Sequence, residues 1–275
     1  MPLPHATMSP FPSRQAALAP ERAPVPVPPD SITAQLSALY EVAQKNVHVF
    51  ASPLGLFESG SGPGHLPRFV FFGPHATDES WRLAFLAGFD RRELRASRAL
   101  LQLLQTLADH AEAGHGLNLT FFPLIDVARL LPGAAPRRLD QAHWAQSTAP
   151  EIELLEKDAR LRGYHGFVRV VSTTDDDDLV SVRVRAPANF PLSPDVELIS
   201  SEETAPLPVQ FERAASHAVA GGPLTIADDL LVQPFELTLG IPAAWPDDRY
   251  QAAVVAILTR FIIRYRALQA YGQHL

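Results

Sequence analysis

The sequence predicts an α/β fold, a single domain with a mixed, mostly parallel sheet and helices on both faces. Two observations favour it. Short apolar runs typical of buried strands alternate with helical patterns along the 275-residue chain, and no internal repeat interrupts this alternation. Apolar residues make up 47% of the chain, which is enough for a substantial core.

The first ordered element is expected to be a helix that begins after Ser31. Ser31 is a good N-cap residue, and apolar residues such as Ile32 and Leu36 then fall on one helical face. The preceding segment, residues 1–30, holds nine prolines and no period that could pack. We therefore expect a flexible, proline-rich tail over residues 1–30 and one domain over residues 31–275.

The first half of the domain alternates strands and helices. Residues 55–67 are rich in Gly, Ser and Pro, so we expect a loop there. The apolar runs at 68–72, 81–86 and 117–122 predict buried strands, and leucines at helical spacing predict a helix over 93–107.

The second half continues the alternation. A helix is expected over 149–160, where acidic residues in the first turn suit the helix dipole. Strands are expected over 167–171, 180–184 and 235–239, and a long helix opens at Pro246.

Composition excludes several classes of function. Thirty acidic residues against 23 basic ones give a net charge of −7, the opposite of what a nucleic-acid-binding protein needs. The absence of cysteine excludes disulfides, Cys-ligated metals and thiol nucleophiles. No segment reaches the ~18 apolar residues of a membrane helix, and the N-terminus lacks a signal-peptide pattern. We expect a soluble, cytoplasmic protein that binds neither nucleic acid nor membrane.

Common catalytic motifs are also missing: a phosphate-binding loop, a nucleophile elbow and a His-Glu-x-x-His helix. His75 lies in a turn between two expected strands and has no obvious third metal ligand, so we interpret it as a surface-loop histidine. The acidic run 175–178 follows the carboxyl end of a strand, where ligand sites gather. Asp175 and Asp176 are candidate ligands of a hard cation, and the alternative is a solvated acidic loop.

Six segments between Leu66 and Arg266 occur in an order that carries more information than any one of them. They are RFVFFGP (68–74), LAFLAG (83–88), FP (122–123), RLDQAHW (138–144), PEIELLE (150–156) and PFELTL (234–239). Their order resembles the zinc metallocarboxypeptidase family, in the bacterial branch that is similar to succinylglutamate desuccinylases and aspartoacylases. The resemblance implies a zinc-carboxypeptidase-like α/β fold.

The resemblance also implies positions for the catalytic groups. In the family, a His, a Glu three residues later and a distant His hold zinc, and a Glu near the C-terminus is the general base. The first His position is occupied here by Asp90, the Glu position by Glu93 and the second His position by Thr173. The general-base position is Gly240, which has no side chain.

The substrate-binding positions differ from the family as well. The family's Asn-Arg pair, whose arginine grips a substrate carboxylate, corresponds to Asp140 and Gln141, although Arg137 or Arg138 could compensate in part. The Asn-Pro turn corresponds to Asp126-Val127. We therefore expect a catalytically degenerate member, a pseudoenzyme without a metal cofactor that binds an unknown protein or a small acidic ligand.

Two enzymatic alternatives remain open. The first is a hydrolase, either a metallocarboxypeptidase or an N-acyl amino acid deacylase, with a rebuilt carboxylate metal site. Asp90, Glu93 and Asp175 or Asp176 would hold a divalent cation such as Mg²⁺, Mn²⁺ or Ca²⁺, helped by His143 or His165 as acid or base. The second is an ordinary zinc enzyme whose motifs align differently.

Overall fold

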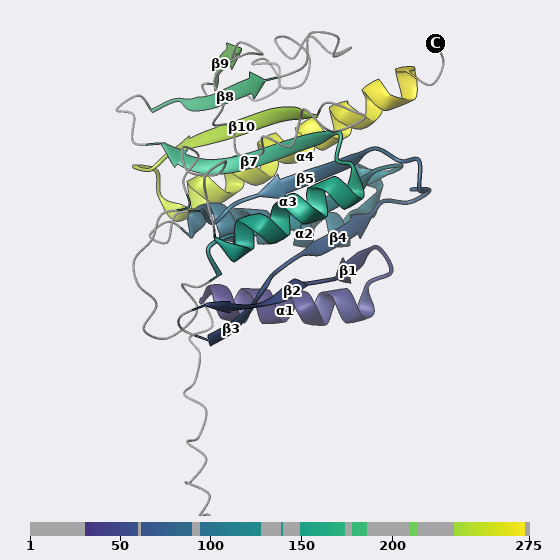
Figure 1. The fold of residues 1–275 in the computed structure, drawn as a ribbon. Helices are drawn as coiled ribbons and strands as arrows, with labels where there is room; N and C mark the ends of the chain where they lie inside the picture. The colour runs from purple at the N-terminus through teal and green to yellow at the C-terminus, as the bar shows by residue number, and fades with distance from the viewer. Residues whose placement is uncertain are drawn as a thin grey trace, which may run out of the picture.

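The computed structural model describes eight segments of the chain. These are residues 31–59, 62–89, 94–127, 139, 149–173, 178–185, 209–213 and 234–272. The tail expected over residues 1–30 lies outside them. Figure 1 shows an α/β domain in which helices flank one large sheet.

The sheet has eight strands in the order β1-β4-β6-β5-β7-β10-β8-β9. Their bounds are Val49–Ala51 (β1), Phe69–Phe72 (β4), Arg82–Leu86 (β5), Asn118–Phe122 (β6), Gly166–Thr173 (β7), Val180–Arg185 (β8), Val209–Arg213 (β9) and Phe235–Pro242 (β10). The central strands β6, β5, β7 and β10 are mutually parallel. β1 and β4 join antiparallel to their neighbours, and β8 is antiparallel to β10 but parallel to β9. The predicted mixed, mostly parallel sheet is confirmed, and the carboxyl ends of four strands meet at one edge.

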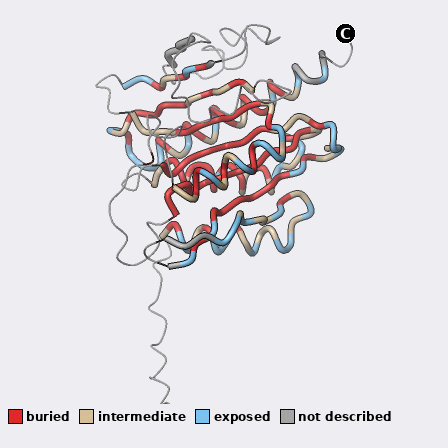
Figure 2. Tube along the Cα trace, in the orientation of Figure 1, coloured by how far each residue is buried: buried red, intermediate tan, exposed pale blue. Residues whose placement is uncertain are grey.

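Helices cover both faces, as the alternation of apolar patterns predicted. The helices α1 (Ile32–Lys45), α2 (Arg95–Asp109) and α4 (Asp247–Gly272) share one buried cluster with the sheet, and α3 (Pro150–Arg162) lies in a second cluster on the other face. Figure 2 shows the buried residues concentrated between these layers. No helix in the described segments is long and apolar enough to cross a membrane.

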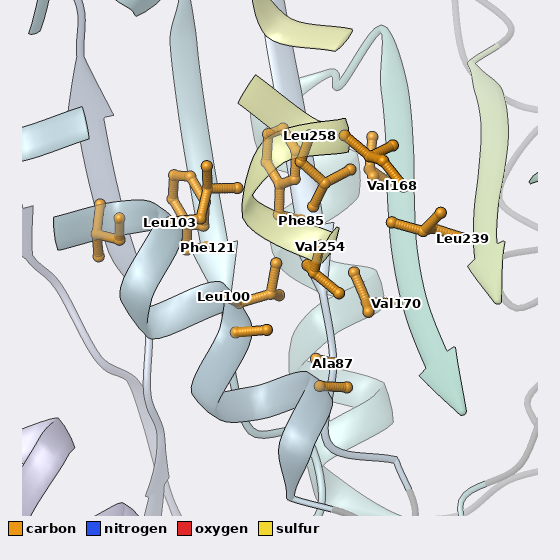
Figure 3. Close-up of a cluster of buried hydrophobic side chains, with 14 of the residues drawn as sticks. Phe85, Ala87, Leu100, Leu103, Phe121, Val168, Val170, Leu239, Val254 and Leu258 are labelled. Atoms are coloured by element: carbon orange, nitrogen blue, oxygen red, sulfur yellow. The ribbon is translucent and has the colours of Figure 1, made fainter. Parts of the chain in front are cut away.

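The larger core lies between α2, α4 and the parallel strands. Figure 3 shows leucine and valine side chains of the two helices meeting aromatic and β-branched side chains of the sheet. Those labelled are Leu100 and Leu103 of α2, Val254 and Leu258 of α4, and Phe85, Ala87, Phe121, Val168, Val170 and Leu239 from the sheet and its connections. This packing fixes the parallel strands whose carboxyl ends carry the candidate site.

A buried ion pair ties α3 to the other face of the sheet. The guanidinium of Arg68, just before β4, donates to the carboxylate of Asp158 on α3, and both side chains are more than nine-tenths buried. The Tyr164 hydroxyl donates to the second oxygen of the same carboxylate at 2.6 Å. Burial and the Asp158 charge raise the pKa of Tyr164, so this hydroxyl stays a donor.

The loop expected over residues 55–67 is wrong: the chain forms a hairpin of β2 (Leu54–Ser59) and β3 (Gly62–Leu66). The register shifts between Leu54 and Phe57, and Gly55 in this irregularity has φ +58°. A Cβ atom on Gly55 would lie 2.8 Å from a methyl carbon of Leu154 on α3. Here glycine permits an irregular turn of the strand and a close approach to a helix, rather than marking a loop.

Candidate functional site

The candidate site lies at the edge where the carboxyl ends of β5, β6, β7 and β10 meet. The segments that follow β5 and β6 run side by side there. The backbone N–H of Asp126 donates to the Gly88 carbonyl oxygen at 2.9 Å, and the N–H of Leu139 donates to the Phe89 carbonyl oxygen at 3.3 Å. Three of the segments on which the family resemblance rests, 83–88, 122–123 and 138–144, therefore reach the same edge of the sheet. This is the edge where α/β proteins bind ligands.

Several of the predicted site residues fall outside the described part of the chain. They are Asp90, Glu93, Arg137, Arg138, Asp140, Gln141, His143, Asp175 and Asp176. Their chain neighbours are described, however. Asp90 directly follows Phe89, and Asp140 directly follows Leu139, so two of these positions adjoin the hydrogen-bonded pair at this edge. Their roles stay predictions.

The structure places Thr173 and Gly240 next to each other. Gly240 on β10 pairs with Val171 on the parallel strand β7, two residues before Thr173, and with Ser181 on the antiparallel strand β8. A Cβ atom on Gly240 would lie 2.6 Å from the Thr173 methyl carbon Cγ2 and still closer to the Ser181 hydroxyl oxygen. The two positions that the resemblance assigns to a zinc ligand and to the general base are thus neighbours in space.

The space beyond Gly240 is already filled. Real Cβ atoms do not approach other heavy atoms as closely as 2.6 Å, so even alanine at position 240 requires Thr173 and Ser181 to move. The sequence analysis missed Ser181. Its contact depends on the register between β8 and β10, and no motif around residue 181 signals it.

Hydrogen bonds and a cation–π contact fix the backbone just beyond β10. The Arg95 guanidinium, at the start of α2, donates to the carbonyl oxygens of Ala243 and Trp245, both at 2.9 Å. It also lies 5.0 Å from the centre of the buried Tyr250 ring. The Ser172 hydroxyl donates to the Tyr250 hydroxyl at 3.1 Å. These contacts hold the ends of β7 and β10 in one arrangement.

The last residue of the acidic run is engaged by protein groups. The Trp245 indole N–H donates to the Asp178 carboxylate, and the Arg249 guanidinium lies 3.4 Å from the same carboxylate. Arg249 also stacks 3.7 Å above the Trp245 ring. The charge of Asp178 is therefore balanced by an arginine of α4, whereas Asp175 and Asp176 remain candidate cation ligands.

A buried arginine lies below this edge on the face covered by α3. Arg169 of β7 is 6% exposed, and its guanidinium lies 4.5 Å from the centre of the Phe89 ring. Asp126 and Glu151 are acidic residues that are also fully buried. Each of these three charged residues interacts with other groups of the protein. The sequence analysis missed Arg169, although a charged residue inside an apolar strand run is a visible signal.

His165 lies at the edge of the sheet where the parallel strands β5 and β7 begin, opposite the candidate site. Its Nδ1 accepts a hydrogen bond of 3.0 Å from the Arg82 backbone N–H, and its ring stacks on Trp81 with 5.4 Å between centroids. Burial, and then the Arg82 charge, lower the pKa of His165. Residues 166 and 173 are separated by the full length of β7, about 23 Å at ~3.3 Å per residue. The acid–base role considered for His165 beside the carboxylates is therefore wrong.

Within the described residues, no group of three or more His, Asp or Glu side chains could hold a metal ion. Two of the positions that the resemblance assigns to the catalytic site are described: Thr173, at a zinc-ligand position, offers a hydroxyl, and Gly240, at the general-base position, has no side chain. A hydroxyl is not among the usual zinc ligands, which are imidazole, thiolate and carboxylate.

Comparison with known proteins identifies the fold. No protein-family model matches the sequence, and no curated protein is significantly similar to it in sequence. A metallo-carboxypeptidase from Burkholderia cenocepacia superposes with a TM-score of 0.64 at 15% identity, covering 84% of this chain and 68% of that one. A Pseudomonas aeruginosa metallo-carboxypeptidase in complex with (2-guanidinoethylmercapto)succinic acid gives 0.57 at 16% identity, covering 82% and 67%.

A third solved structure extends the likeness. An aspartoacylase family protein from Mesorhizobium loti gives a TM-score of 0.51 at 15% identity, covering 79% of this chain and 68% of that one. Both groups named by the sequence resemblance are thus found among the structural neighbours. The chain has the α/β fold that metallo-carboxypeptidases and aspartoacylase family proteins share.

Proposed function

We propose that this chain is a catalytically degenerate protein with the metallo-carboxypeptidase fold, which binds a ligand or partner without hydrolysing it. The absence of a side chain at Gly240 carries the proposal. A general base must reach the attacking water with a carboxylate or imidazole, and such a group is typically worth ~10²–10⁴ in rate. Gly240 supplies none, and a Cβ atom at this position would require the Thr173 methyl group and the Ser181 hydroxyl to move.

Thr173 supports the same proposal through the metal. Zinc in this kind of site lowers the pKa of a bound water and polarises a carbonyl, which requires ligands that hold the ion firmly. A neutral threonine hydroxyl is a poor replacement for an imidazole. Asp90 and Glu93 alone would leave zinc with two protein ligands, so we expect no zinc and no other metal cofactor at this edge.

The same edge remains suited to binding. Thr173, Ser172 and Ser181 carry hydroxyl groups that can donate and accept hydrogen bonds, and Arg137 or Arg138 would add positive charge. A small acidic ligand, or an acidic segment of a partner protein, fits this chemistry. Because the chain holds no cysteine and needs no disulfide, we place it in the cytoplasm.

The decisive experiment is a hydrolysis assay on the purified chain. Peptides with free C-termini and N-acyl amino acids are incubated with the protein, with added Zn²⁺ and with a chelator. We expect no hydrolysis above that of buffer. Chelator-sensitive hydrolysis that disappears in Glu93→Gln would overturn the proposal, and the Glu93→Gln control separates activity of this chain from that of a contaminant.

The same assay tests the alternative of a rebuilt carboxylate metal site. Hydrolysis that depends on Mg²⁺, Mn²⁺ or Ca²⁺, and is lost in Asp175→Asn or Asp176→Asn, would establish that alternative. A gain-of-function series asks whether the missing groups explain the inactivity. Asp90→His, Thr173→His, Gln141→Arg and Gly240→Glu are combined, and Ser181→Ala is included because the serine hydroxyl blocks position 240.

A further inference from the structure

Two tight turns are joined at the edge of the sheet opposite the candidate site. One follows β4 and contains His75; the other follows the short 3₁₀ helix Ala111–Gly114 and contains His115. The Gly116 N–H donates to the Pro74 carbonyl oxygen at 2.8 Å, and the Gly73 N–H donates to the Leu117 carbonyl oxygen at 3.0 Å. These backbone bonds bring the His75 and His115 rings to 4.9 Å between centroids.

Glycines allow the two turns to approach this closely. A Cβ atom on Gly73 would collide with the Gly114 carbonyl oxygen, and one on Gly114 would collide with the Phe71 ring. The turns are therefore as close as their backbones permit. The two imidazoles, forty residues apart in sequence, are held together by the main chain rather than by flexible side chains.

His75 has an unusual backbone conformation. Among the described residues, it is the one non-glycine residue with a positive φ, at 59°. This left-handed region is unfavourable for most side chains, although histidine and asparagine tolerate it better than others, and such outliers concentrate at functional positions. The conformation belongs to the turn that sets the His75 ring beside His115.

A carboxylate orients the second ring. His115 Nδ1 lies 3.3 Å from a carboxylate oxygen of Glu112, so Nδ1–H donates to Glu112 and the Nε2 lone pair is left available. Histidines that bind metals typically use one ring nitrogen and donate from the other to a carboxylate. The His115 side chain is 42% exposed and His75 is exposed, so an ion from solvent can reach both rings.

The spacing of the rings matches shared coordination. A Zn–N bond of about 2.0–2.1 Å places a ring centre roughly 3.2 Å from the ion, and two such rings at a tetrahedral angle have centres about 5 Å apart. We propose that His75 and His115 form a surface site for an imidazole-binding divalent ion, Zn²⁺ or its neighbours Ni²⁺ and Cu²⁺. Water completes the coordination, and Glu112 is a positioning residue that orients His115.

The guanidinium of Arg266 lies near this turn, and its positive charge should repel a bound divalent ion. The Arg266 guanidinium donates to the Glu112 carbonyl oxygen at 2.6 Å, which keeps a positive charge close to this turn. Repulsion from this charge weakens the site. Removing it in Arg266→Gln should strengthen metal binding, whereas a contact between two histidines that binds no metal would not respond.

The test is a calorimetric titration of the purified chain with ZnCl₂. We expect saturable binding that weakens at least tenfold in His75→Asn and in His115→Gln, and binding about tenfold weaker in Glu112→Gln, as is typical when such a carboxylate partner is lost. His65→Gln, which removes an exposed histidine from β3, is the matched control and should bind as the unmodified chain does. Mg²⁺ should not compete, because it prefers oxygen ligands.

Two features keep the test decisive. Asparagine tolerates the left-handed conformation, so His75→Asn should fold. Thermal unfolding of this variant in the absence of metal checks that it does. Zn²⁺ should raise the melting temperature of the unmodified chain but not of His75→Asn. Binding that is absent, that survives both histidine variants, or that Mg²⁺ displaces would overturn the proposal. The hydrolysis assay is independent of this result, since the pair lies at the other edge of the sheet.

Discussion

Replacing Gly240 by alanine tests directly whether Thr173 and Ser181 fill the space beside β10. Two effects oppose each other. Gly→Ala at a position without a positive φ normally stabilises a protein by about 0.4–1 kcal/mol, because the unfolded chain loses freedom. Overpacking a filled site costs about 1–3 kcal/mol. With a contact of 2.6 Å to Thr173 Cγ2 and a closer one to Ser181 Oγ, overpacking should win. We expect Gly240→Ala to destabilise the chain.

The effect of Gly240→Ala on the free energy of unfolding should change sign once the side chains of Ser181 and Thr173 are shortened. Ser181→Ala removes the hydroxyl oxygen and leaves Ser181 Cβ at 3.7 Å from the new methyl group, an ordinary contact. Thr173→Ser removes the second obstacle, Cγ2. In the Ser181→Ala, Thr173→Ser background, Gly240→Ala should therefore stabilise the chain by about 0.4–1 kcal/mol.

Urea unfolding of the four proteins in this cycle measures the coupling between position 240 and its neighbours. Thermal unfolding gives a second readout, at roughly 2–4 °C for each kcal/mol in a domain of this size. An alanine that stabilises the unmodified chain, or that has the same effect in both backgrounds, would refute the filled-space argument. The inference that glutamate is excluded at position 240 would fall with it.

Three further predictions concern stability. Phe261→Ala in the core should cost about 3–5 kcal/mol, and an unchanged urea midpoint would contradict the burial of this ring. Asp158→Ala leaves the buried Arg68 guanidinium unpaired and should cost about 3–5 kcal/mol by the same measurement; a cost below 1 kcal/mol would show that the pair is not buried in solution. Because the pKa of His165 is lowered in the folded state, the unfolded state takes up the proton first, and stability should fall as pH drops below about 6.5. His165→Gln should flatten this part of the pH profile, and an unchanged profile would assign it to other groups.

The sequence was sufficient to predict the elements whose side-chain pattern reflects burial. Leucines at helical spacing identified α2, and apolar runs identified β5, β6 and β7, because burial on both faces removes polar residues from a central strand. The order of these elements also supported the resemblance that the structural neighbours confirm for the fold.

Other features depend on contacts that no local pattern records. The β2–β3 hairpin was missed because its glycines and prolines are also typical of loops. Ser181 meets Gly240 only through the register of β8 against β10, and His115 meets His75 through two backbone bonds between distant turns. The family resemblance named Thr173 and Gly240, and His75 was interpreted as a surface-loop histidine, but the structure was needed to show what lies against each of them.

The contact between Ser181 and Gly240 also restricts which substitutions position 240 can accept. A single codon change that introduces an acidic side chain at position 240 meets an occupied volume, so its first effect is loss of stability rather than gain of chemistry. Shortening Ser181 and Thr173 beforehand brings no catalytic benefit for selection to act upon. The effect of a substitution at position 240 should therefore depend on whether residues 173 and 181 have changed first, which is epistasis between neighbouring strands.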